Sequence, residues 1–139
     1  MNGNKIIDGK LISSEIRDKI KKFGNELQNK SGKKPGLAVV LVGEHPASKV
    51  YVRNKIEKTK EVGFNSIEHK LEDNVSEEQL LELVNRLNKD DNVQGILVQL
   101  PLPDHINSDK VLDQIKPEKD VDGFHAVNVG RLWSGMNSL

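Results

Sequence analysis

The sequence predicts an α/β domain in three layers, with a mostly parallel sheet flanked by helices. Two short apolar runs, 37–42 and 95–98, are typical of strands buried on both faces, as in a parallel sheet. Segments with apolar residues at helical spacing lie before, between and after these runs. A chain of 139 residues is long enough to bury one core, so we expect a single domain over residues 1–139.

The first predicted helix covers about residues 10–29. Its apolar residues recur every three or four positions: Ile12, Ile16, Ile20, Phe23 and Leu27. A stretch at 29–36 containing serine, glycine, lysine and proline then predicts a loop that leads into the strand at 37–42.

The second helix is predicted to begin at Pro46 or Ala47, because proline suits the first turn of a helix. It ends before Gly63, since glycine readily adopts the left-handed conformation that follows a helix end. A weak strand is expected at 66–71.

The third helix begins after Ser76, because Ser76 and Gln79 have the spacing of a capping box. The buried strand at 95–98 follows and cannot continue through Pro101, which lacks an N–H. A short helix is then predicted from about Ser108.

Composition excludes several classes of protein. The 21 basic side chains balance 21 acidic ones, so the chain lacks the basic excess that nucleic acids or anionic membranes select. The absence of cysteine excludes disulfides, a thiol nucleophile and cysteine-based metal sites. The longest apolar run, 37–42, is far shorter than the ~18–20 residues that cross a bilayer, and the polar start resembles no signal peptide. We expect a cytoplasmic protein that binds neither nucleic acid nor membrane.

Three segments are candidates for a binding site. Ligands of parallel sheets bind beyond the carboxyl ends of the strands, where we expect to find residues 43–55, 99–103 and 120–124.

Tyr51 and Lys55 are four residues apart in the second predicted helix, so they share one face. A lysine sheltered in a cleft can transfer protons, and a tyrosine offers a flat ring and a hydroxyl. Charged neighbours such as Arg53 and Glu57 favour the simpler interpretation of a solvated helix face. The same Tyr-x-x-x-Lys pattern occurs in short-chain dehydrogenases, but this chain lacks the G-x-G-x-x-G turn that their nucleotide site requires.

Gln99 ends a buried strand among apolar neighbours, so its amide must find hydrogen-bond partners. Those partners belong either to a ligand or to the proline-containing loop that follows. Asp120 and Asp122 precede Gly123, which favours a turn. Recognition of a heterocycle with adjacent N–H donors is the next interpretation, and a metal site the last, because the further oxygen ligands of a calcium loop are missing.

The four histidines, at positions 45, 69, 105 and 125, have no metal-ligand spacing. We expect surface or helix-capping histidines and no bound metal.

Taken together, these segments resemble the bifunctional methylenetetrahydrofolate dehydrogenase/methenyltetrahydrofolate cyclohydrolase family, and specifically its amino-terminal folate-binding half. The most specific stretches are Gly-Ile-Leu-Val-Gln-Leu-Pro-Leu-Pro at 95–103 and Lys-Asp-Val-Asp-Gly-Phe-His at 119–125. The other matching stretches are 7–10, 41–43, 46–48, 51–55, 61–64 and 128–132.

The resemblance implies roles for five residues. Lys55 would be the catalytic lysine that assists attack of water on the methenyl bridge of the folate, with Gln99 setting its protonation and position. Tyr51 would pack against the folate and hold it in register with Lys55. Asp122 would accept the N–H edge of the pterin, and Pro101 would belong to the same substrate site.

The resemblance also implies the activity of the intact family protein. That protein interconverts methylene-, methenyl- and formyl-tetrahydrofolate as an NADP-dependent dehydrogenase and a cyclohydrolase, supplies purine biosynthesis and forms a homodimer. Its NADP sits in a second, Rossmann-type domain with a glycine-rich turn, and this chain ends at Leu139, before such a domain. We therefore expect no NADP binding and no dehydrogenase activity here. The alternative to cyclohydrolase activity is a folate-binding module or partial subunit without turnover.

Overall fold

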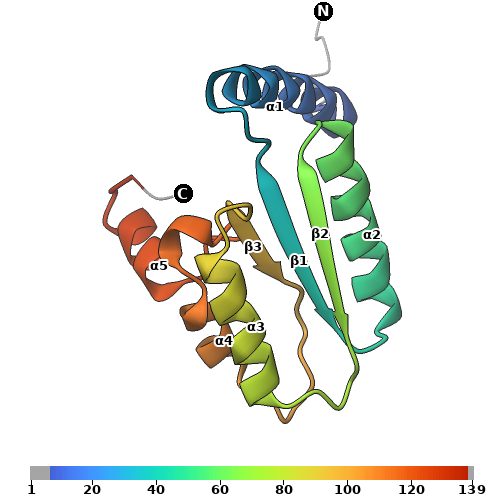
Figure 1. Ribbon diagram of the computed structural model, residues 1–139, viewed down its shortest axis with the longest axis vertical. Helices are drawn as coiled ribbons and strands as arrows, with labels where there is room; N and C mark the ends of the chain where they lie inside the picture. Colours follow the sequence, from blue (N-terminus) through green and yellow to red (C-terminus); the bar gives the residue numbers. More distant parts are fainter. Residues whose placement is uncertain (1–6, 138–139) are drawn as a thin grey trace, which may run out of the picture.

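A three-stranded parallel sheet carries helices on both of its faces (Figure 1). The structure, a computed structural model, describes residues 7–137. The strands are β1 (Gly36–Val42), β2 (Asn65–Leu71) and β3 (Gly95–Val98), and β1 lies between the other two. The helices are α1 (Gly9–Ser31), α2 (Pro46–Glu61), α3 (Glu77–Lys89), α4 (Ser108–Gln114), the 3-10 helix η1 (Pro117–Lys119) and α5 (Ala126–Trp133). The predicted fold class is confirmed.

Side chains of β1 point alternately to the two faces of the sheet, and each face has its own apolar cluster. Val39 and Leu41 pack with Val52 of α2 on one face. Val40 packs with Leu80 of α3 on the other, in a larger cluster that also contains residues of α4. Because β1 is covered on both sides, it needs the continuous apolar run that the sequence provides.

The helix boundaries follow the predicted local signals. Pro46 is the first residue of α2, and Gly63 lies beyond its end with φ +86°. The capping box at α3 is present: Gln79 N–H donates to Ser76 Oγ at 3.2 Å, and Ser76 N–H donates to Gln79 Oε1 at 3.1 Å. Every predicted element is found, whereas η1 and α5 were not predicted.

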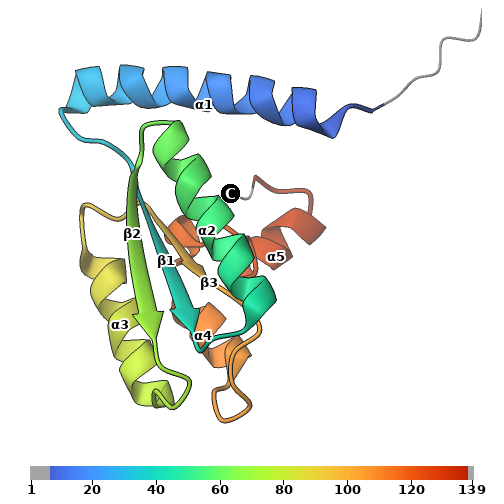
Figure 2. The same cartoon turned by 90° about the vertical axis from the view of Figure 1, so that its right-hand side faces the viewer.

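Helix α1 is the element whose packing differs most from a usual amphipathic helix. It crosses one end of the sheet, away from the two apolar clusters (Figures 1 and 2). Gly24 is its buried residue, and a Cβ there would lie 2.5 Å from the ring of Phe64. Leu11 is exposed, and so are the apolar residues that recur every three or four positions, which we call the α1 stripe: Ile12, Ile16, Ile20, Phe23 and Leu27. None of the helices within residues 7–137 is long and apolar enough to span a membrane.

Candidate functional site

Lys55 and Gln99 meet at the flank of α2 that faces β3. Lys55 Nζ donates a hydrogen bond to Gln99 Oε1 at 3.2 Å, although the two residues are 44 positions apart in sequence. Gln99 Nε2 donates to the carbonyl of Leu100 at 2.7 Å, and Gln99 N–H donates to the carbonyl of Val40 at 2.9 Å. The Gln99 side chain therefore both fixes the loop after β3 and contacts the half-buried lysine.

Buried side chains of α2 hold Lys55 at this position. Val52, one turn before Lys55, is 1% exposed and packs on β1 and β3. Thr59, one turn after it, is also buried, and its hydroxyl donates to the carbonyl of Lys55 at 2.8 Å. Tyr51 shares the face of Lys55 by helical spacing, and its side chain is 61% exposed. Tyr51 and Lys55 thus lie at the edge of α2, where a ligand can reach both side chains.

The chain leaves the sheet immediately after Gln99. The Leu100–Pro101 peptide bond is cis, Pro101 is exposed, and Leu102 is buried in the larger cluster. Pro101 is therefore placed at the surface, two residues beyond the amide that contacts Lys55.

The segment that contains Asp120 and Asp122 begins beside β3. Asp120 forms a parallel bridge with Ile96, and a Cβ on Gly95 would lie 2.5 Å from Cγ1 of Val121. Gly95 and Ile96 are the first two residues of β3, so Asp120 and Val121 lie beside the amino-terminal half of that strand. The expectation of a position beyond the carboxyl ends is therefore wrong for these two residues, because the backbone of Asp120 extends the sheet as a further parallel partner.

Asp120 forms the predicted turn and is buried inside it. Its Oδ1 accepts the Gly123 N–H at 3.1 Å, and Gly123 has φ +71°. Its Oδ2 accepts the His125 N–H and Asn128 Nδ2, both at 2.9 Å. Burial acts to raise the pKa of Asp120, but hydrogen bonds from Asn128 and the loop amides together hold it below the ordinary value. Asp122 is exposed on this turn.

The histidines divide into two kinds. His45 and His125 cap α2 and α5, and His105 Nε2 lies 2.8 Å from the carbonyl oxygen of Val75. The fourth, His69 of β2, caps no helix and is half-buried, and its Nε2 has no hydrogen-bond partner in the described part of the chain. Within residues 7–137, no three acidic or histidine side chains are grouped so that they could hold a metal ion.

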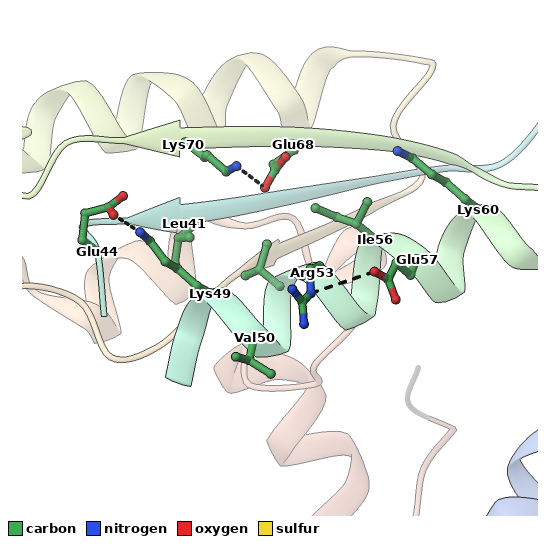
Figure 3. A pocket seen from close by; sticks show the side chains of 11 residues that line it. Leu41, Glu44, Lys49, Val50, Arg53, Ile56, Glu57, Lys60, Glu68 and Lys70 are labelled. Atoms are coloured by element: carbon green, nitrogen blue, oxygen red, sulfur yellow. Dashed lines mark hydrogen bonds and ion pairs between the residues drawn. The ribbon is translucent and has the colours of Figure 1, made fainter. Parts of the chain in front are cut away.

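A groove of about 510 Å³ lies on the other flank of α2, between that helix, β1 and β2 (Figure 3). Its charged side chains form three ion pairs, of which Arg53–Glu57 is 3.9 Å and Lys70–Glu68 is 3.3 Å long. None of the five predicted site residues lines it. The groove is therefore separate from the Lys55–Gln99 contact.

Residues 7–122 match the family described as tetrahydrofolate dehydrogenase/cyclohydrolase, catalytic domain. The chain belongs to this family. It is 53% identical over 134 residues to bifunctional protein FolD 2 of Roseobacter denitrificans and 54% identical to FolD of Listeria innocua. These matches cover 96% of this chain but only 45% and 47% of the two relatives, so the chain spans about half of their length.

Solved structures of the family share the fold. The bifunctional FolD enzyme of Campylobacter jejuni superposes with a TM-score of 0.91 at 48% identity, covering 94% of this chain and 46% of that one. The FolD of Trypanosoma brucei, solved with NADP and an inhibitor, gives 0.92 at 36% identity, covering 99% and 47%.

Sequence reasoning did not assign a role to Asn128, which the structure places against Asp120. The Asp120–Gly123 spacing signals the turn, and the capping position of His125 signals the start of α5. Neither signal indicates that a buried amide from α5 completes the hydrogen bonding of Asp120. That contact requires the tertiary fold.

Proposed function

We propose that residues 1–139 form the folate-binding catalytic domain of a tetrahydrofolate dehydrogenase/cyclohydrolase, and that this domain hydrolyses methenyltetrahydrofolate. The Lys55–Gln99 hydrogen bond carries the proposal, because it brings together the two residues to which the family resemblance gives catalytic roles. Lys55, Gln99 and Tyr51 are the proposed catalytic residues. The wider setting, one-carbon metabolism that supplies purine synthesis, in the cytoplasm and in a homodimeric intact protein, is inferred from the family.

Hydrolysis needs a group that moves protons at the methenyl carbon. Attack of water on the methenyl carbon forms a C–O bond and releases one proton. The hydroxyl of this adduct then loses its proton as the C=O bond forms, and the nitrogen freed by rupture of one C–N bond takes up a proton. One amine near that carbon can accept the hydroxyl proton and donate a proton to the nitrogen. Gln99 Oε1 accepts one N–H of Lys55 and so orients the rest of the amine.

The substrate also has to be held. Tyr51 presents an exposed ring one turn from Lys55, suited to stacking on an aromatic part of the folate. The exposed carboxylate of Asp122 suits the adjacent N–H donors of a pterin, which it can accept in pairs. Pro101 lies at the surface beside Gln99 and adds an apolar contact.

The described residues do not fit NADP. A dinucleotide needs a glycine-rich turn that exposes the amides of a helix N-terminus to its pyrophosphate. Here α2 begins after Glu44 and His45, and His45 Nδ1 accepts the Ser48 N–H at 3.5 Å. The other α-helices of the described chain are capped by their own Asp8, Ser76, Asn107 and His125 side chains.

The test is the loss of methenyltetrahydrofolate absorbance above the uncatalysed rate. Lys55→Met keeps most of the stem and removes the amine, so it should abolish hydrolysis while folate binding persists. Lys58→Met is the matched control, because Lys58 lies on the same helix, is about half exposed and pairs with Glu61. Equal rates for the unchanged chain and Lys55→Met would contradict the catalytic role. Binding without hydrolysis by the unchanged chain would establish the folate-binding module instead.

A further inference from the structure

The carboxylate of Asp120 is enclosed by three donors from residues 123–128. Asp120 is 2% exposed, and its oxygens accept the Gly123 N–H, the His125 N–H and Asn128 Nδ2 at 2.9–3.1 Å. Its backbone is paired with Ile96 of β3. Asp120 thus connects the sheet, the turn and the first turn of α5.

Asn128 is buried with Asp120 and has a fixed orientation. Its Nδ2 donates to Asp120 Oδ2 and also to the carbonyl of Pro117 at 2.8 Å. Both acceptors require the amide nitrogen on that side, so the side chain cannot be flipped without losing two hydrogen bonds. Asn128 therefore anchors α5 to η1 and to Asp120 at once.

Asp122 lies between anchored neighbours. Asp120 is bound to β3, Val121 packs over Gly95, and the Gly123 N–H is bound by the Asp120 carboxylate. The backbone on each side of Asp122 is held, although its own side chain is exposed. Removing the donor from Asn128 loosens this turn without touching Asp122.

We propose that Asp120 and Asn128 are positioning residues that hold the Asp122 carboxylate in place for the folate. This inference rests on the proposed function, in which Asp122 receives the pterin. If a residue acts by positioning Asp122, its substitution should weaken folate binding much less when Asp122 has already been removed. Substitution of a merely structural residue should weaken binding equally with and without Asp122.

The experiment measures binding of 5-formyltetrahydrofolate by calorimetry for Asn128→Ala, Asp122→Ala and the double variant. Asn128→Ala should weaken binding by about tenfold. In the Asp122→Ala background, the same change should add less than about twofold. Amide hydrogen exchange at Gly123 and His125 should be faster in Asn128→Ala.

Asn88→Ala is the matched control. Asn88 is also a buried asparagine, and it donates to the carbonyl of Gln114 at 2.7 Å and accepts from the Lys116 N–H at 2.9 Å. The Asn88→Ala variant should have a lower melting temperature, but its folate binding and its amide hydrogen exchange at Gly123 should be unchanged.

The outcomes separate the two proposals. Absence of binding by the unchanged chain would overturn the proposed function, and this role with it. Normal binding by the unchanged chain together with equal binding by Asn128→Ala would overturn this inference alone. An equal loss with and without Asp122 would also overturn it, because the effect would then be general destabilisation.

Discussion

At the scale of single residues, Gln99 links the position of Lys55 to the loop after β3. Its Oε1 accepts from Lys55 Nζ, and its Nε2 donates to the carbonyl of Leu100. Gln99→Met keeps the chain length but removes both polar atoms, so the amine loses its orienting contact. We expect methenyltetrahydrofolate hydrolysis to fall by about 10²-fold, measured by absorbance.

Gln94→Met is the control for this prediction. Gln94 Oε1 accepts the Gly36 N–H and Nε2 donates to the carbonyl of Asp91, both at 2.7 Å. Gln94 therefore makes the same number of side-chain hydrogen bonds as Gln99, but to backbone groups only and at the start of β3 instead of its end. A similar loss of activity in both variants would show that Gln99 acts only through stability.

His69 is a residue where stability should increase on substitution. It lies in β2 opposite Val40, and the neighbouring Ile67 and Leu71 pack on the larger cluster. Its Nε2 is buried without a partner in the described chain, which costs about 1–3 kcal/mol. We expect His69→Leu to raise the free energy of unfolding by ~1 kcal/mol in urea titration. His105→Leu should do the opposite, since it removes a contact to Val75.

At the scale of elements, α1 shows that apolar residues at helical spacing predict a helix but not the surface against which that helix packs. The α1 stripe is 38–69% exposed, and Gly24 is the buried residue of the helix. We therefore expect Ile16→Lys and Phe23→Lys to change the free energy of unfolding by less than about 0.5 kcal/mol. Leu80→Ala, at a fully buried position of α3, should cost about 2–5 kcal/mol. A large loss in the α1 variants would mean that the stripe is covered in solution.

The elements also show which parts of the fold and site could be predicted from the sequence. Local signals sufficed for α2 and α3, because proline at a first turn and a capping box act within a few residues. Spacing placed Tyr51 and Lys55 on one face. The bridge between Ile96 and Asp120 could not be predicted, because it joins backbone groups 24 residues apart without a characteristic side-chain pattern.

At the scale of the whole molecule, the placement of Asp120 makes stability depend on pH. Burial raises the pKa of this carboxyl, but hydrogen bonds, first among them that from Asn128, bring it below the ordinary value of 3.8. The folded state therefore binds the proton less readily than the unfolded chain does. This contribution to stability is complete above the unfolded value, about pH 4, and is lost as the pH falls through the lower folded value.

Asn128→Ala tests this linkage. The variant removes a donor to the ionised carboxylate, so it should be less stable than the unchanged chain at pH 7. Once Asp120 is protonated, that donor contributes less, and the two unfolding free energies should approach each other as the pH falls below about 4. The measurement is urea denaturation from pH 7 to pH 3. The Asn88→Ala control should keep a constant difference from the unchanged chain, because Asn88 bonds backbone groups that do not titrate. A constant difference for Asn128→Ala as well would show that the charge of Asp120 does not stabilise the fold.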